Sequence, residues 1–117
     1  MRFELRMRGG VVGWSDPVEL DRAAAIGYGS FSPGPEYVRV EPVFRLWARA
    51  RLESDPAVKE QLLSRYAAER RALPLELWGP DGGRWPTTSI HVVDLRSPSG
   101  EGALELEVRF ADGVLTV

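Results

Sequence analysis

His91 is the only histidine in the chain, and its side chain is the one whose ordinary pKa lies near neutral pH. In the segment SIHVVDL at 89–95, the two-residue period of a strand places Ser89 and His91 on one face and Asp94 on the other. A Ser-His-Asp relay needs the acid to orient the imidazole, so these three residues cannot form one. We therefore predict no catalytic residue, and the simplest interpretation of His91 is an imidazole held in a strand.

The segment AAIGYGSFSPGPEY at 24–37 contains a Gly-x-Gly pair that matches the start of a dinucleotide-binding fingerprint. Such a loop binds phosphate through backbone N–H groups and a helix N-terminus that follows directly. Here Ser32 takes the place of the third glycine, two prolines remove N–H donors, and no lysine follows. We predict a surface connection with Phe31 or Tyr28 packed onto the core, and no phosphate site.

Ligands for a metal ion are scarce in this sequence. Cysteine is absent and there is one histidine, whereas the usual zinc site needs several of these residues. Asp16, Glu19 and Asp21 could approach a hard cation, but the spacing and the glycine of an EF-hand loop are missing. We interpret them as an acidic turn and predict neither a metal nor a cofactor.

The composition is that of a folded globular protein, with 117 residues, 44% hydrophobic and 27% charged. We expect a single domain over residues 1–117. No apolar run is long enough to span a bilayer, and MRFELRMRGG at the N-terminus lacks the pattern of a signal peptide. Together with the absence of cysteine, these features predict a cytoplasmic protein that does not associate with membranes.

Two biases in the composition concern the source and the partners. Lys59 is the only lysine among 15 basic residues, Gln61 is the only glutamine, and asparagine is absent. The arginine-rich composition indicates a GC-rich bacterial genome, and the depletion of Asn, Gln and Cys is typical of thermophiles. With a net charge of −2 and no helix-turn-helix or RNA-binding signature beside the arginines, we predict no nucleic-acid partner.

The first forty residues predict strand-like runs at 2–8 and 11–14 and a short strand at 37–40. Residues 2–8 alternate apolar and charged side chains, which is typical of a strand with one buried face. Gly9-Gly10 then suits a two-residue hairpin turn. Residues 15–22 begin with turn-forming residues and predict an irregular segment, and residues 37–40, YVRV, predict a short strand.

The middle of the chain predicts helices. Segment 42–52 fits both periods: alternate residues give one apolar face of a strand, and an i, i+3, i+4, i+7 set gives the apolar face of a helix. Its alanines and arginines favour a helix that starts near Pro42. Asp55-Pro56 is a strong helix start, and apolar residues at helical spacing predict a helix over 56–73.

The last forty residues predict strands. Residues 75–78 alternate, and 79–83, GPDGG, has the composition of a turn. Residues 87–95 have apolar side chains on both faces, which indicates a central strand, and residues 104–110 alternate cleanly. In 112–117, Asp-Gly precedes VLTV, which predicts a hairpin whose last strand lies at a sheet edge.

These elements predict an α+β protein with a mainly antiparallel sheet and one or two helices packed on one face. Opposite charges on the exposed faces of 2–8 and 104–110 indicate that these two strands are neighbours.

Four tryptophans are many for a chain of this length, and tryptophan is enriched in cores and at the centres of interfaces. Trp78 and Trp85 flank the turn at 79–83, so we assign them to an interface. We therefore predict a non-catalytic protein-interaction or structural module, which forms a homodimer or binds a protein partner.

The alternative is a small-ligand-binding protein or enzyme. Its pocket would lie between helix 56–73 and the sheet, near His91, with Tyr66 and a carboxylate beside the imidazole.

Overall fold

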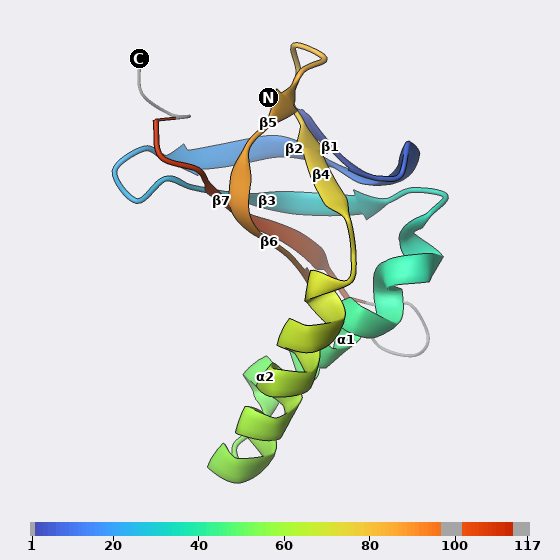
Figure 1. The fold of residues 1–117 in the computed structure, drawn as a ribbon, viewed down its shortest axis with the longest axis vertical. Helices are drawn as coiled ribbons and strands as arrows, with labels where there is room; N and C mark the ends of the chain where they lie inside the picture. Colours follow the sequence, from blue (N-terminus) through green and yellow to red (C-terminus); the bar gives the residue numbers. More distant parts are fainter. Residues whose placement is uncertain (1, 97–101, 114–117) are drawn as a thin grey trace.

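The computed structural model describes residues 2–96 and 102–113, which form one antiparallel sheet and two helices packed against it (Figure 1). The α+β prediction is confirmed. In chain order the elements are β1 (Phe3–Met7), β2 (Gly10–Asp21), β3 (Ile26–Pro33), α1 (Tyr37–Leu52), α2 (Pro56–Arg71), β4 (Leu75–Trp78), β5 (Arg84–Trp85), β6 (Thr87–Asp94) and β7 (Leu104–Phe110). Neither of these helices combines the length and the apolar character that crossing a bilayer requires.

The sheet is strongly curled. Its strand order is β5-β4-β1-β2-β3-β7-β6, so β5 and β6 lie at opposite ends although only Pro86 separates them in sequence. Across the curl, the Phe3 ring lies 4.9 Å from that of Trp85 and 6.2 Å from that of Phe110. The inward side chains of both ends of the sheet thus share one hydrophobic core.

The free edge of β6 is covered by helices. Helix α1 packs against β6 and α2 packs against α1. Arginines from these helices also reach backbone carbonyls: Arg70 donates to the Ile90 carbonyl at 2.9 Å, and Arg45 to the Arg96 carbonyl at 3.1 Å. An uncovered edge strand offers unpaired backbone groups to other chains. The helices and their arginines protect this edge.

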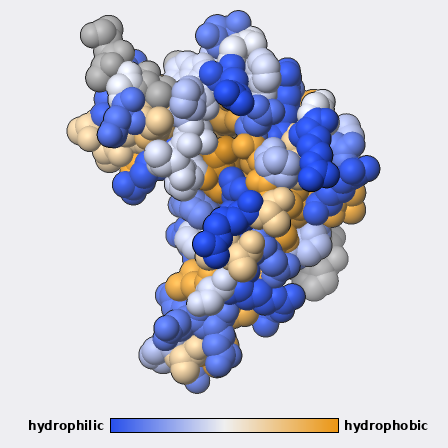
Figure 2. All heavy atoms as spheres, viewed as in Figure 1, coloured by the Kyte–Doolittle hydropathy of each residue, from blue (hydrophilic) through white to orange (hydrophobic). Residues whose placement is uncertain are grey.

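Both predicted helices are present. At the start of α2, the Asp55 side chain accepts hydrogen bonds from the backbone of Ala57 and Val58 at 2.9 and 3.4 Å, as the capping signal predicted. Helix α2 ends at Arg71, and of its side chains only Leu62 and Tyr66 are buried. Its outward side is largely hydrophilic (Figure 2).

Segment 42–52 belongs to a helix, as favoured, but this helix begins earlier than expected. Helix α1 starts at Tyr37, so the strand predicted for 37–40 is wrong, and Pro42 lies in the second turn. The β-branched YVRV sequence is typical of a strand, yet Tyr37, Val40 and Phe44 are buried together along one side of α1. Tertiary packing therefore overrides local propensity here.

Two segments expected to be irregular are strands. The irregular segment predicted at 15–22 is the second half of β2, which continues to Asp21 past a bulge between Ser15 and Val18. The connection predicted within 24–37 contains β3, which pairs on both sides, with β2 and β7. Turn-forming residues were misleading in both places, because bulged and glycine-containing strands accommodate them.

Gly27, the first glycine of the Gly-x-Gly pair, serves packing. A side chain at Gly27 would meet the Phe110 ring, since a Cβ placed there lies 2.9 Å from it. Glycine at this position lets the backbone of β3 lie close to the Phe110 ring of β7. Phe31 is buried, as one of the two predicted options, and Tyr28 is 46% exposed.

Three finer predictions about the sheet also differ from the structure. Strands 2–8 and 104–110 are not neighbours, because β2 and β3 lie between β1 and β7. The strand predicted to be central, 87–95, is the edge strand β6. The first turn uses Arg8-Gly9, both at positive φ, in place of Gly9-Gly10. Residues 114–117, the last strand of the predicted hairpin, lie outside the described residues.

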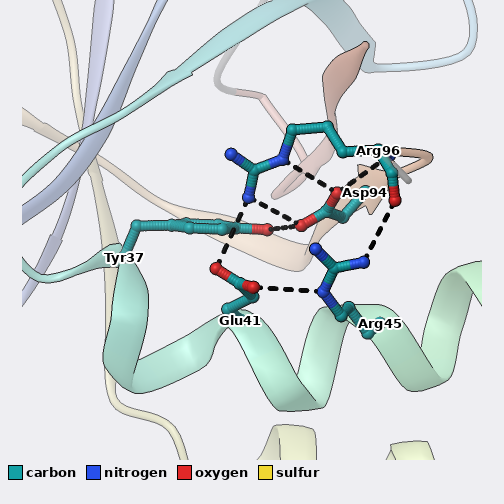
Figure 3. Close-up of polar contacts among 5 residues, drawn as sticks. All are labelled: Tyr37, Glu41, Arg45, Asp94 and Arg96. Carbon is teal, nitrogen blue, oxygen red and sulfur yellow. Dashed lines mark hydrogen bonds and ion pairs between the residues drawn. The ribbon is translucent and has the colours of Figure 1, made fainter. Parts of the chain in front are cut away.

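A buried carboxylate fixes the start of α1 to the end of β6 (Figure 3). Asp94 is fully buried and accepts a hydrogen bond from the Tyr37 hydroxyl at 2.8 Å. Arg96 binds both Asp94 oxygens, at 3.0 and 3.1 Å, and Glu41 lies between Arg96 and Arg45. Two acids and two arginines thus alternate, and the cluster carries no net charge. We call these five residues the Asp94 anchor.

The Asp94 anchor makes stability depend on acid pH. Burial acts to raise the pKa of Asp94, but hydrogen bonds from Arg96 and Tyr37 outweigh it and hold the pKa below its usual value. The stability from such a carboxyl is complete above its unfolded pKa of about 3.9 and is lost as pH falls through the lower folded value. We therefore expect the Asp94→Asn variant to lose less unfolding free energy than the wild type between about pH 5 and pH 2.

Urea unfolding at a series of pH values measures this effect. Tyr37→Phe is the milder companion: it should cost about 1.5–3 kcal/mol at neutral pH, the usual worth of a hydrogen bond to a charged group. Tyr28→Phe, at an exposed position, is the control and should change stability by less than about 0.5 kcal/mol. A pH profile for Asp94→Asn as steep as that of the wild type would contradict the role given to Asp94.

Candidate functional site

A cleft of about 330 Å³ opens beside His91, over the face of β3, β7 and β6 that points away from the core. Two rows of paired residues cross these strands. One row is Ile26, Arg109 and Ser89, and the next is Tyr28, Glu107 and His91. Trp47 of α1 and Val108 complete the lining, and "the cleft" hereafter means these eight residues.

One wall of the cleft is an aromatic cluster. The His91 ring stacks on the Trp47 ring, with centroids 4.4 Å apart and planes 13° from parallel. The Tyr66 ring lies 4.9 Å from Trp47, and its hydroxyl is 2.6 Å from Nδ1 of His91. The two residues predicted to share a pocket are therefore in direct contact. Tyr66 is buried behind His91, however, and the cleft is bounded by α1 where α2 was expected.

The hydrogen bond between Tyr66 and His91 joins two neutral groups. Burial lowers the pKa of His91, the Arg70 and Arg51 guanidinium groups lower it further, and only Glu107 opposes them. Burial likewise raises the pKa of the Tyr66 phenol above its usual value. With the hydroxyl as donor to Nδ1, the imidazole carries its hydrogen on Nε2, the nitrogen that Tyr66 leaves free.

The charges of the cleft are unevenly compensated. Glu107 forms an ion pair with Arg51 of α1. The Nη1 atom of Arg51 lies 3.1 Å from the Oε1 atom of Glu107. Among the described residues, no carboxylate forms an ion pair with Arg109, which lies directly across from Ser89. The cleft therefore contains one acid, Glu107, with an ion-pair partner and one cation, Arg109, that has none within residues 2–96 and 102–113.

The geometry offers no catalytic relay. Ser89 and His91 share the face that the sequence predicted, and Asp94 belongs to the opposite face, in the Asp94 anchor. Within the described residues, the hydrogen bonds of His91 include none to Ser89, and Nδ1 faces a phenol where a relay needs a carboxylate. No group of three metal-ligating side chains is assembled in that part of the chain.

A second surface lies on β4, β1 and β2. Trp78, Glu4 and Trp14 form a row across these strands, on the face that points away from the core. The Arg6 guanidinium lies 4.3 Å from the Trp78 ring and is paired with Glu4, and that of Arg2 lies 5.4 Å from the Trp14 ring. We call these five residues the tryptophan face. They line a shallow hollow of about 280 Å³ with Phe3 and the turn after β4.

The two tryptophans predicted for an interface point in different directions. Trp78 belongs to the tryptophan face, and its buried Nε1 has no hydrogen-bond partner in the described part of the chain. Trp85 packs inward against Phe3 and Phe110. An interface role for either residue stays a prediction.

Of the eight cleft residues, sequence reasoning assigned only His91 to a ligand pocket. Trp47 read as an ordinary core residue of a helical stripe, and Glu107 and Arg109 read as a solvated strand face. The two-residue period placed Ser89 with His91 and Glu107 with Arg109 correctly. The two-residue period could not predict the strand register, which places Ser89 opposite Arg109 and His91 opposite Glu107.

The chain's single histidine makes the electrostatics of the cleft measurable by NMR titration. We expect the His91 midpoint below the ordinary 6.5, because burial and nearby arginines disfavour the imidazolium. Glu107→Gln should lower the midpoint further, since the carboxylate that favours the imidazolium is removed. Arg51→Gln should raise it. The urea-unfolded chain provides the reference, and a folded midpoint at or above 6.5 would contradict this description.

No protein-family model, no curated protein and no solved structure matches this chain. Similarity to other proteins therefore contributes nothing to the assignment of a function, which depends on the geometry of the cleft and of the tryptophan face.

Proposed function

We propose that this chain is a non-catalytic binding protein that takes a small organic ligand in the cleft. The observation that carries the proposal is the combination of an aromatic wall, Trp47 stacked on His91, with a few polar groups that face the same hollow. Ligand sites are concave, mostly apolar and contain a small number of placed polar groups. A volume of about 330 Å³ suits a small molecule.

The cleft is supported from behind, as a binding site needs to be. His91 is held by the Tyr66 hydroxyl and by the Trp47 ring, and Tyr66 is itself buried. Arg70 fixes the strand next to His91 through the Ile90 carbonyl. A preorganised wall binds a ligand without first losing side-chain entropy.

A thermal-shift screen with small aromatic and aliphatic metabolites tests this proposal. A ligand at 100 times its Kd stabilises the folded state by about 2.7 kcal/mol, which raises the melting temperature by several degrees. We expect such a shift for the wild type, and we expect His91→Ala to lose it because one wall of the cleft is gone. Trp78→Phe, on the tryptophan face, is the control and should retain the shift. A shift that persists in His91→Ala, or no shift with any compound, would contradict the proposal.

A second candidate is the protein-interaction module predicted from the sequence, with a second copy of this chain as partner. The tryptophan face supports it because the face is complementary to itself. It contains arginines, and it also contains the glutamate and the tryptophans that arginines bind through ion pairs and cation–π contacts. In a twofold dimer one surface meets itself, so Arg6 of each copy can exchange Glu4 of its own chain for that of its neighbour. The small net charge of −2 opposes such an approach little.

Light scattering over a range of concentrations tests the dimer. We expect a mass of twice 13.0 kDa for the wild type and a monomer for Arg6→Glu, which places like charges on both copies of the face. Mixing Arg6→Glu with Glu4→Arg should restore the pair. Arg65→Glu on α2 is the control and should remain dimeric. A wild-type mass of 13.0 kDa at every concentration would exclude this candidate.

A further inference from the structure

We propose that the ligand of the cleft is a small monocarboxylate with a flat apolar body. Its carboxylate binds Arg109 and Ser89, and its body lies against Trp47. This inference rests on the proposed ligand-binding function and adds the chemical class of the ligand and the residue that selects it.

The charges of the cleft favour an anion. Arg51 already compensates the negative charge of Glu107 at a distance of 3.1 Å, so Glu107 does not favour a positively charged ligand. Arg109 has no ion-pair partner among the described residues, so one positive charge remains uncompensated. A cationic ligand would be repelled by Arg109, and a neutral ligand would leave it unpaired. A carboxylate matches the planar guanidinium with two parallel hydrogen bonds.

The register of β7 and β6 places a second donor beside Arg109. Ser89 is its direct cross-strand partner, and such partners have Cβ atoms about 4.5–5.5 Å apart. One carboxylate bound to Arg109 is therefore within reach of the Ser89 hydroxyl. His91 follows two residues later on the same face, and its Nε2 is free of the Tyr66 bond. Together these three side chains offer donors to one anionic group.

The rest of the lining suits an apolar, flat body. Ile26 is the partner of Arg109 on the other side, in β3, and Trp47 overhangs from α1. Aromatic rings favour stacked or edge-to-face contact with another ring. The volume of about 330 Å³ lies at the small end of known ligand sites, which limits the body to one or two fused rings.

Phosphate is a poorer match than carboxylate. The lining residues include no start of a helix, so the usual helix-terminal backbone donors for phosphate are missing from the cleft. One uncompensated arginine balances one negative charge. The cleft is therefore matched to a monoanion.

Two matched ligand series test the inference by isothermal titration calorimetry. They are phenylacetate, phenylacetamide and phenethylamine, and indole-3-acetate, indole-3-acetamide and tryptamine. Within each series the ring is constant and the polar group changes from anion to neutral amide to cation. We expect the acid to bind at least about tenfold more tightly than the amide, and the amine to bind most weakly.

The variant Arg109→Gln separates the class of ligand from the existence of the site. We expect it to abolish the preference for the acid while the amide binds as before. Arg65→Gln, an exposed arginine on α2, is the matched control and should leave the preference intact. Glu107→Gln should not weaken binding of the acid.

Each remaining outcome overturns the inference in a distinguishable way. Amides or amines that bind as tightly as acids, with an affinity that His91→Ala abolishes, would leave the cleft a ligand site and remove the carboxylate from it. A preference for acids that survives Arg109→Gln would place the anion elsewhere. If none of the six compounds binds, the carboxylate inference fails, and the metabolite screen then decides separately whether the cleft is a ligand site.

Discussion

The buried carboxylate of Asp94 is the constraint on which the arrangement of this chain depends. A charge taken out of water is tolerated only when it is paired and hydrogen-bonded, and here Arg96 and Tyr37 together meet that demand. Because Tyr37 is the first residue of α1, its hydrogen bond to the buried Asp94 carboxylate also fixes where the helix starts. The electrostatic requirement of one strand residue thereby becomes a positional requirement on a helix of 16 residues.

The position of α1 in turn creates the cleft. Trp47 lies ten residues after Tyr37, about 15 Å along the helix axis. Since β6 is an edge strand, α1 can cross its free edge, with Tyr37 bound to Asp94 on the core side and Trp47 stacked on His91 on the outer side. The same helix therefore protects the edge and builds one wall of the site.

Sequence patterns predicted most elements and missed what depends on distant contacts. The capping signal at Asp55 and the alternation in 104–110 are local, and both predictions hold. The strand predicted at 37–40 fails because the decisive partner of Tyr37 lies 57 residues away. The cleft could not be predicted for the same reason. The strand period shows that Ser89 shares a face with His91 and that Glu107 shares a face with Arg109, but only the strand order and register place these two pairs side by side.

Strand β6 divides its two roles between its two faces. Ile90, Val92 and Asp94 belong to the core side, and Ser89 and His91 belong to the cleft. A slip of one residue would turn His91 inward and Asp94 outward, which would leave a buried imidazole without Tyr66 and Tyr37 without its carboxylate. Register is therefore specified twice, by apolar burial and by two hydrogen bonds to different helices. The geometry of the cleft inherits this precision, because the row of Ser89 and Arg109 and the row of His91 and Glu107 exist only in this one register.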